Sequence, residues 1–306
     1  LMITSPNTTF GKWADEWLET YKKPTVTNGW YKDIKSMLKN HLLPCLGGLQ
    51  LNKIRPVHIQ SCINGMSGRS YSLVNKAVVI LKDILQRAVE NGLILTNPAQ
   101  SVIMPKTTKG ERRSLTVDEE QRLLDVLADS HYGGFFGIML ACGLRVGEAM
   151  ALTWFNVDMK NQTISITQAV ENHSSNIKEP KTKAGFRTIP IPEWYLPYLN
   201  KPKTSQFVFT NTKNKMIRDD TMRKAWNKLT EQAMLSTEIT PYYLRHTYAT
   251  SLAEREVDMK TAQYLLGHSD IAVTAKVYTH VTDRMIETAR NKINSINVKP
   301  PKVARK

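Results

Sequence analysis

Tyr278 lies near the end of the segment YLLGHSDIAVTAKVYTH, residues 264–280, and admits two interpretations. It follows Ile271 by seven positions and Thr274 by four, so on a helix it would share a face with an apolar residue and fill a core. Alternatively, its phenol oxygen is a nucleophile that forms a covalent intermediate. His268, ten positions earlier, and isolated arginines upstream keep this second interpretation open.

Two arginines lie in apolar surroundings. Arg145 stands in ACGLRVGEAMALTW, where a charge costs free energy unless it is paired, and Glu148 could pair with it three positions later. Arg245 stands in TPYYLRHTYATSLAE, about one turn into a helix that we expect to begin with Thr240 as N-cap and Pro241 as first residue. A helix N-terminus favours anions. The structural alternatives are a closed ion pair and a surface arginine beside a cap.

A lysine and a histidine complete the set of candidate reactive groups. Lys181, in EPKTKAGFRTIPIP, is expected in a loop or hairpin tip; the alternative is an ordinary basic turn that also holds Arg187. His268 is expected in a turn, after a helix that Gly267 ends and before a helix that Asp270 or the preceding serine caps. A lone histidine is more often structural or solvated than reactive.

Composition indicates a polyanionic partner. The 306 residues hold 42 Lys and Arg against 27 Asp and Glu, a net charge of +15, and such an excess steers a protein toward nucleic acid. The alternative is a basic protein with no special partner. A hydrophobic content of 41% supports two buried cores rather than one.

The sequence gives no sign of a membrane or an export route. No apolar stretch approaches the ~20 residues of a membrane span, and the chain does not start with a signal sequence. Cys45, Cys62 and Cys142 are odd in number and lack CxxC spacing, which excludes a disulfide framework or a zinc site. We therefore expect a protein of the reducing cytoplasm.

The first part of the chain is predicted to be a helical domain, residues 8–104. Aromatic residues recur at three- and four-residue steps in TFGKWADEWLETYKK, and similar patterns cover 28–44 and 70–92. Residues 105–114 are predicted to form a basic linker, which could lie along phosphates or be a solvated tether. Its basic residues are Lys106, Lys109, Arg112 and Arg113.

The second domain is predicted over residues 115–297. Thr116 and Glu119 form a capping box ahead of an apolar run. QTISITQAV and GFRTIPIP have the character of strands and predict a long hairpin or three short strands, with helices after them. The fold class is therefore mainly α with a small antiparallel β-sheet: a helical domain followed by a mixed α/β domain. The tail, 298–306, is basic and expected to be disordered.

Taken in order, the motifs GLRVGE, PKT, LRHT and LLGHSDIAVTAKVYTH resemble those of the tyrosine recombinases, and most of all the integrases of phages and conjugative transposons. The resemblance covers about residues 8–297. The C-terminal block, LGHS followed by a short helix and YTH, is very specific, whereas the first domain matches only in pattern. The resemblance implies a helical core-binding domain followed by the catalytic domain of this family.

The resemblance also implies a role for each candidate residue. Tyr278 would be the nucleophile, and Lys181 the general acid of a hairpin. Arg145 and Arg245 would be the phosphate-binding pair, and His268 would occupy the position that holds His or Trp in the family.

One position departs from the family pattern. The family usually has histidine three residues before the second arginine, where this chain has Tyr242. A tyrosine hydroxyl can donate a hydrogen bond to a phosphate, but it is a far poorer proton acceptor near neutral pH. Any base role must then fall to another group or to water. Glu148 and His246 are expected to support the reacting residues rather than to react.

The implied function is site-specific DNA recombination, for integration and excision of a mobile element. One strand is cut per active site through a 3′-phosphotyrosine, which leaves a free 5′ hydroxyl. No cofactor, metal or ATP is expected: Asp219 and Asp220 are interpreted as the start of a helix, and no GxxxxGK[ST] motif occurs. The alternatives are a non-catalytic basic DNA-binding regulator and, more distantly, a metal-dependent nuclease.

The implied partners are double-stranded DNA and further copies of the chain, as dimers or tetramers on DNA. In the family, a C-terminal segment docks on a neighbouring protomer; packing on its own domain is the alternative. Accessory directionality or DNA-bending proteins are also implied, as is a bacterial, nucleoid-associated location. Many relatives carry a further N-terminal domain for arm sites; none is visible here, and the unusual start at Leu1 suggests truncation. Apolar residues line one face of the C-terminal segment: Met285, Ile286, Ala289, Ile293 and Ile296.

Overall fold

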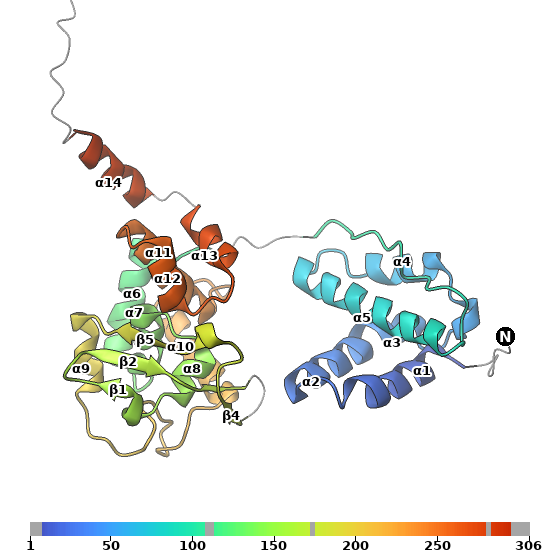
Figure 1. Cartoon of the computed structure of the whole chain (residues 1–306), viewed down its shortest axis with the longest axis horizontal. Helices are drawn as coiled ribbons and strands as arrows, with labels where there is room; N and C mark the ends of the chain where they lie inside the picture. Colours follow the sequence, from blue (N-terminus) through green and yellow to red (C-terminus); the bar gives the residue numbers. More distant parts are fainter. Residues whose placement is uncertain (1–7, 108–112, 172–174, 280–282, 295–306) are drawn as a thin grey trace, which may run out of the picture. The chain divides into compact units, whose positions relative to one another are not determined.

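The structure is a computed structural model that describes residues 8–107, 113–171, 175–279 and 283–294. The chain divides into two compact units, Leu1–Glu111 and Arg112–Lys306 (Figure 1). Among the described helices, none combines the length and apolarity that a bilayer-spanning segment requires.

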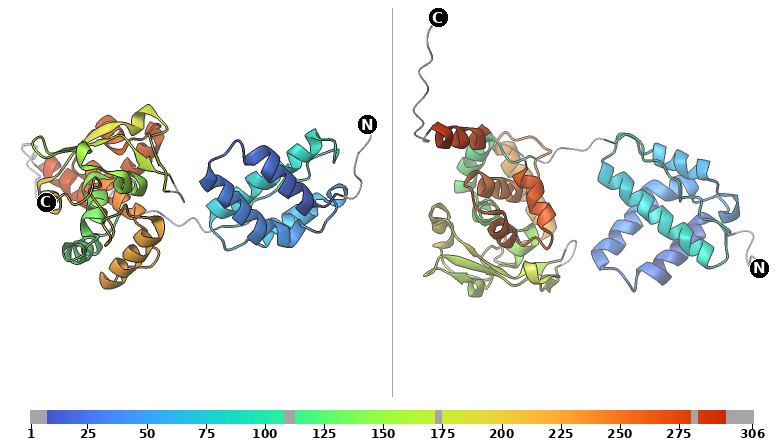
Figure 2. Two further views of the ribbon diagram at one scale, coloured as in Figure 1. Left: turned by 90° about the horizontal axis from the view of Figure 1, so that it is seen from below. Right: turned by 45° about the horizontal axis from the view of Figure 1, so that its top comes forward.

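The first unit is a bundle of helices (Figures 1 and 2). Side-chain oxygens of Thr9, Thr27 and Ser70 accept hydrogen bonds from backbone N–H groups and so cap three of the helices. The helices are α1 Phe10–Trp17, α2 Asn28–Met37, α3 Leu43–Leu46, α4 Pro56–Asn64 and α5 Tyr71–Glu90. Two π-helical turns, Leu18–Lys22 and Leu38–Leu42, extend α1 and join α2 to α3, and a 3₁₀ turn spans Leu51–Lys53.

The aromatic stripe of the first helix fills the core of this unit. Phe10, Trp13 and Trp17 are buried, and the indole N–H of Trp13 donates to the backbone carbonyl of Ile84 at 3.0 Å. The predicted helices of this region are confirmed. The π turns were not predicted, because one extra residue in a turn leaves almost no trace in the spacing of apolar residues.

The second unit combines helices with a small sheet. Its helices are α6 Val117–Ala128, α7 Gly133–Cys142, α8 Val146–Ala151, α9 Leu196–Leu199, α10 Asp219–Gln232, α11 Tyr242–Glu254, α12 Met259–Leu266, α13 Ile271–Tyr278 and α14 Asp283–Asn294. An antiparallel sheet has the order β1 Val157–Asp158, β2 Thr163–Ile166, β5 Arg187–Pro190. A second antiparallel pair joins β3 Ala169–Val170 to β4 Ile177–Lys178. The predicted fold class is confirmed.

The core of the second unit is built around α7. This helix is apolar on every side and nearly all of it is buried, as expected for a helix that neighbours surround. Helix α11 packs against it. In the sheet, Ile164 of β2 pairs with Ile189 of β5, and Ile166 pairs with Arg187, so an arginine takes a position in an otherwise apolar row.

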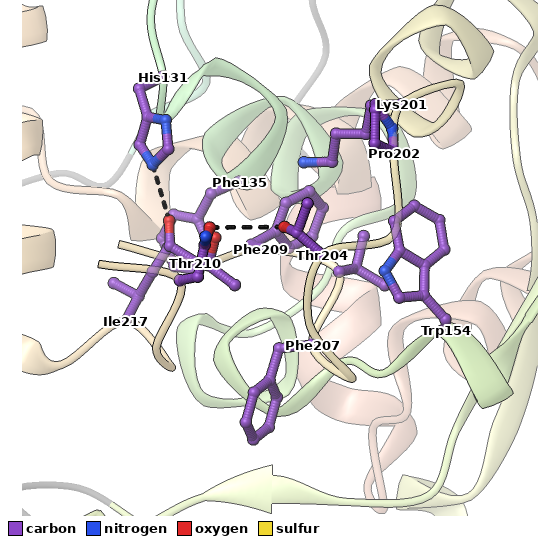
Figure 3. Close-up of a pocket in the computed structure, with 12 residues that line it drawn as sticks. His131, Phe135, Trp154, Lys201, Pro202, Thr204, Phe207, Phe209, Thr210 and Ile217 are labelled. Carbon is purple, nitrogen blue, oxygen red and sulfur yellow. Dashed lines mark hydrogen bonds between the residues drawn. The ribbon is translucent and has the colours of Figure 1, made fainter. Parts of the chain in front are cut away.

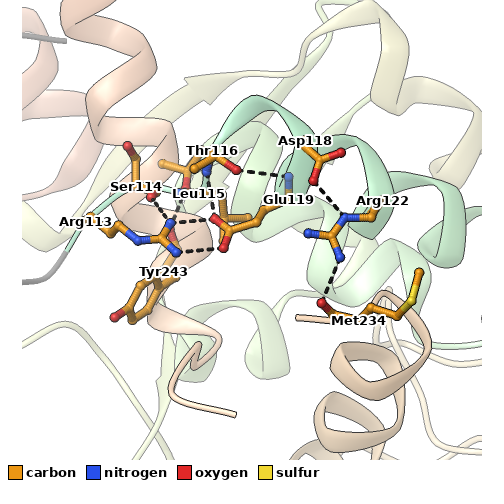
Figure 4. A network of polar contacts seen from close by, with 10 residues as sticks. Arg113, Ser114, Leu115, Thr116, Asp118, Glu119, Arg122, Met234 and Tyr243 are labelled. Carbon is orange, nitrogen blue, oxygen red and sulfur yellow. Dashed lines mark hydrogen bonds and ion pairs between the residues drawn. The ribbon is translucent and has the colours of Figure 1, made fainter. Parts of the chain in front are cut away.

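The start of the second unit is tied down by polar contacts (Figure 4). The predicted capping box is present, with the Glu119 N–H donating to the Thr116 hydroxyl and the Thr116 N–H to the Glu119 carboxylate. Arg122 donates to the backbone carbonyls of Ala233 and Met234, which joins α6 to the end of α10.

Two details of the second unit differ from expectation. Helix α11 begins at Tyr242 with Pro241 at the N-cap, one residue later than predicted. Strands β1 and β4 were not predicted, because each has only two residues and is too short to show an alternation of apolar and polar side chains. The predicted tail, 298–306, lies outside the described residues.

Candidate active site

The turn at the end of α12 gathers the candidate residues. The last carbonyls of a helix have no partner within it and carry partial negative charge. Here three consecutive carbonyls each accept a hydrogen bond from a different arginine: Leu265 from Arg187 Nε at 2.8 Å, Leu266 from Arg245 Nη2, and Gly267 from Arg145 Nη2 at 2.9 Å. We call these three arginines, with Glu148, the arginine cluster. Its members come from β5, α11 and the N-terminal end of α8.

Gly267 is required for this turn. It has a φ of +63° and ends α12, as the sequence predicted. A Cβ at this position would lie 2.9 Å from both the carbonyl oxygen of Ala184 and Nη1 of Arg187. A larger residue would therefore be strained in the backbone and would also push on the arginine cluster.

Glu148 is the carboxylate of the cluster and is only 4% exposed. The predicted pair with Arg145 is present at 2.7 Å, and the Arg145 backbone N–H donates to the other carboxylate oxygen. Arg187 also binds both oxygens, at 3.1 and 2.8 Å. Burial alone would raise the pKa of Glu148, but the hydrogen bonds and charge of Arg187, together with Arg145, lower this pKa to about 2. Glu148 is therefore ionised at neutral pH.

Arg245 is 2% exposed and also donates through Nη1 to the carbonyl of Gly143 at 2.5 Å. Burial, and then the charge of Arg145, lower the pKa of Arg245 to about 9, so it remains a cation at neutral pH. Two guanidinium groups thus bind one carboxylate, and a third, that of Arg245, acts on it through its charge. The cluster keeps an excess of positive charge that an anion could neutralise.

Sequence reasoning missed the part that Arg187 plays, because it treated this residue as part of a basic turn. Its side chain has 0% exposure. A signal for this was present: Arg187, Ile189 and Ile191 alternate along the chain and are all buried, so the arginine occupies a core position of a strand. Its partner Glu148, which is distant in the chain, could not be predicted from the sequence.

His268 follows the turn and is partly buried. Its Nδ1 is hydrogen-bonded to the hydroxyl of Thr274, a fully buried residue of α13, at 2.9 Å. Burial, and then the charges of Arg245 and Arg145, lower the pKa of His268 from 6.5 to about 4. The imidazole is therefore neutral at pH 7.

Tyr278 is the last residue of α13 and half-buried, with its ring packed against the core. Its hydroxyl donates to the backbone carbonyl of Val257 at 2.9 Å. Burial and the nearby Asp258 raise the pKa of Tyr278 to about 12. In this structure the ring packs against the core, as the first interpretation of the sequence predicted. Its hydroxyl is hydrogen-bonded to a backbone carbonyl.

Lys181 and Tyr242 lie at the surface. Lys181 is exposed in the connection between β4 and β5, and its ammonium has no hydrogen bond or ion pair within the described parts of the chain. Tyr242, 45% exposed, opens α11 one turn before Arg245. His246 is the partly buried residue after Arg245.

The predicted linker residues have different surroundings. Arg113 forms a two-pronged ion pair with Glu119 (Figure 4). The hydrogen bonds from Arg113 lower the pKa of Glu119 to about 2. Lys106 is exposed. Lys109 and Arg112 lie outside the described residues. A contact of these four with DNA stays a prediction.

A cavity of about 200 Å³ in the second unit is separate from these residues (Figure 3). Lys201 lies over the ring of Phe209 at its edge, 5.2 Å from the ring centroid. None of the candidate reactive residues lines this cavity; its lining includes His131, Phe135, Trp154, Phe207 and Thr210.

Comparison with protein families supports the prediction made from the motifs. Residues 113–285 match the phage integrase family, and residues 9–67 match the phage integrase N-terminal SAM-like domain. The chain therefore belongs to the phage integrase family.

Curated relatives cover most of the chain. A tyrosine recombinase XerC-like protein of Caldanaerobacter subterraneus is 26% identical over 325 residues, covering 93% of this chain and 81% of the relative. The integrase of Staphylococcus phage L54a is 26% identical over 335 residues, covering 94% and 93%. The transposase from transposon Tn916 of Enterococcus faecalis is 29% identical over 274 residues, covering 78% and 66%.

Solved structures share the fold. The Tn1549 transposon integrase, in complex with a circular intermediate DNA, has a TM-score of 0.77 at 21% identity, with 94% of this chain and 100% of that chain covered. A lambda integrase dimer bound to a COC′ core site has a TM-score of 0.69 at 18% identity, with 89% and 95% covered.

Proposed function

We propose that this member of the phage integrase family is a site-specific DNA recombinase that cuts and rejoins DNA through Tyr278, for integration and excision of a mobile element. The observation that carries the proposal is the arginine cluster, in which three cations meet at one helix end around a single buried carboxylate. Such a site is built to receive an anion, and the family supplies the anion: a DNA phosphate.

Arg145 and Arg245 would bind the non-bridging oxygens of that phosphate. A guanidinium has five N–H donors. The side chain of Arg145 uses Nη1 for Glu148 and Nη2 for Gly267 and is 41% exposed, so donors remain for a ligand. Because these charges are fixed before DNA arrives, they can stabilise the charge that develops in the transition state without reorganising. The neutral His268 would donate one further hydrogen bond, and Tyr242 another.

The reaction exchanges one phosphodiester for another. The Tyr278 oxygen attacks phosphorus, the bond from phosphorus to the 5′ oxygen breaks, and Lys181 gives its proton to that leaving oxygen. The product is a 3′-phosphotyrosine with a free 5′ hydroxyl, and attack by a 5′ hydroxyl reverses it. The phenol proton passes to water, because Tyr242 is a poor acceptor near neutral pH and the ring nitrogens of His268 are used by Thr274 and the phosphate. Tyr278 must first exchange its bond to Val257 for the phosphate.

The partners proposed for this chain are double-stranded DNA and further copies of itself. Relatives of the same fold support this: a lambda integrase has been solved as a dimer on a core site and as a tetramer on a Holliday junction. Ile286 and Ile293 of α14 are 50% and 65% exposed and suit contact with a neighbouring protomer. Ile296 lies outside the described residues. Accessory proteins remain part of the proposal.

A nicked suicide substrate tests the proposal against a non-catalytic DNA-binding regulator. Cleavage near the nick lets the short product strand diffuse away and traps the covalent complex. We expect the wild-type protein to give a protein–DNA band that survives denaturant and EDTA, and Tyr278→Phe to bind the same DNA without forming that band. An adduct in Tyr278→Phe would contradict the assignment. Strand cleavage that leaves no covalent band and is lost in EDTA would favour a metal-dependent nuclease.

A further inference from the structure

We propose that Arg187 is a positioning residue that fixes the loop bearing Lys181 against the phosphate-binding arginines. The inference rests on the proposed function, in which Lys181 protonates the leaving oxygen. Arg187 does not touch DNA in this account: its side chain has 0% exposure. Its influence on the reaction must therefore pass through the groups that it holds.

The contacts of Arg187 join three elements. From β5 its Nε donates to the carbonyl of Leu265 at the end of α12, at 2.8 Å. Nη1 and Nη2 donate to the two oxygens of Glu148 on α8. Glu148 in turn holds Arg145, and the carbonyl after Leu265 receives Arg245. The planar guanidinium of Arg187 thus connects the strand after Lys181 to Arg145 through Glu148, and to Arg245 through the end of α12.

The loop from Lys181 to Arg187 is also held by contacts within itself. Nη1 of Arg187 also donates back to the carbonyl of Gly185 at 3.1 Å. Gly185 lies so close to Pro180 that an added Cβ would come within 2.3 Å of the proline ring. Pro180, the residue before Lys181, is therefore packed against the turn that Arg187 anchors through Gly185.

A second contact fixes the same strand to α12. The backbone N–H of Thr188 donates to the hydroxyl of Tyr264 at 3.0 Å. The carbonyl oxygen of Ala184 also lies only 2.9 Å from the place that a Cβ on Gly267 would take, so the loop closely approaches this turn. Tyr264 is 52% exposed, however, so its bond is weaker than the buried contacts of Arg187. Arg187 is thus the principal anchor of the Lys181 loop.

The position of Lys181 depends on this anchor because the lysine has no bond of its own within the described residues. When Arg187 is replaced, the loop loses its buried tie to α12, and the ammonium loses a fixed place relative to the leaving oxygen. General-acid catalysis contributes about 10²–10⁴-fold to a rate, and the variant should lose a large part of this acceleration. DNA affinity should change little, since no exposed charge is removed.

The test compares Arg187→Met and Arg187→Lys with wild type in single-turnover cleavage at saturating DNA. Two suicide substrates are used, the ordinary phosphodiester and one with sulfur in place of the 5′ bridging oxygen. A thiol has a pKa of about 8.5, so the sulfur leaves without a proton from Lys181. We expect about a 100-fold slower cleavage of the ordinary substrate and less than about a 5-fold loss with the sulfur substrate, which is the pattern of a misplaced general acid.

Arg122→Met is the matched control. Arg122 also donates to two backbone carbonyls and pairs with a carboxylate, Asp118, but it contacts no member of the arginine cluster. Its substitution should leave the ratio of the two cleavage rates as in wild type. If Arg187→Met does not fold, as judged by thermal unfolding, Arg187→Lys decides, because it keeps a cation beside Glu148 and loses the fork to Leu265.

The outcomes separate this inference from the proposed function. Equal losses on the two substrates, or no loss with the ordinary one, would overturn the role of Arg187 while wild-type cleavage still supports recombination. Absence of any adduct with the wild-type protein on either substrate would instead overturn the proposed function itself. Unchanged DNA binding by Arg187→Lys is expected; a loss of binding equal to the loss of rate would also reject the inference.

Discussion

The arginine cluster and the reacting residues of the second unit are built in opposite ways. Arg187, Arg245 and Glu148 are buried and make several hydrogen bonds each. Tyr278 is half-buried with one described hydrogen bond, and Lys181 is exposed with none among the described residues. One region of the site is fixed by folding, whereas the other has few contacts that would hold it in place.

This difference indicates how the work of catalysis is divided. Electrostatic stabilisation is strongest when charges are held in place before the reaction and away from water. The nucleophile, by contrast, must move to the phosphate, and the exposed side chain of Lys181 must reach the leaving oxygen from the loop that Arg187 holds. Tyr278 exchanges one weak hydrogen bond to Val257 when it moves, a change that binding of DNA can readily offset.

Removing the carboxylate should have the largest effect, because it breaks the fixed region. In Glu148→Gln the buried Arg187 and the neighbouring arginines lose their counter-charge, and we expect the free energy of unfolding to fall by about 3–5 kcal/mol. Chemical denaturation measures this. The control is Asp118→Asn, whose ion pair with Arg122 is exposed and should be worth less than about 1 kcal/mol. Similar losses in the two variants would remove the distinction between the regions.

Lys181→Ala should show the reverse pattern. Because its side chain is exposed, unfolding should be unchanged, while single-turnover cleavage should slow by about 10²–10⁴-fold. Lys183→Ala, an exposed lysine of the same connection, serves as the control for charge alone and should slow cleavage far less. Comparable rates for the two variants would show that the region contributes general attraction rather than a defined proton donor.

Gly267→Ala probes the point where the fixed region is tightest. The added Cβ meets a φ of +63° and lies 2.9 Å from Arg187 Nη1. We expect a loss of about 1–3 kcal/mol in the free energy of unfolding, measured by thermal or chemical denaturation. Gly92→Ala is the control, since Gly92 also has a positive φ, +69°, but has nothing within 4 Å of its Cβ position. A smaller loss at Gly267 than at Gly92 would contradict the close packing of the turn.

The titration of His268 is the most local test. Its pKa of about 4 lies below the ordinary 6.5, so between these values the unfolded chain binds more protons than the folded one. The contribution of His268 to stability is therefore full above pH 6.5 and is lost as the pH falls toward 4. NMR titration of the imidazole should give the low pKa. A value near 6.5 would place the arginine charges farther away than the structure has them.

The sequence predicted those parts of the site that local spacing encodes. Arg145 and Glu148 lie three positions apart, and Gly267 ends a helix, so both features could be predicted from neighbouring residues. The carbonyls that receive the arginines could not, because they lie between 21 and 122 positions away in the chain. Arg187 was missed for the same reason. The expected helices and the main strands followed from periodicity, whereas π turns and two-residue strands have none.

Mass mapping of the trapped complex tests the central claim most directly. The wild-type protein is reacted with a suicide substrate, digested with protease and nuclease, and the peptide that carries nucleotide is sequenced by mass spectrometry. The account predicts one modified residue, Tyr278, joined through its phenol oxygen to the 3′ phosphate of the cleaved strand. Attachment through any other residue, or to the 5′ phosphate, would contradict it.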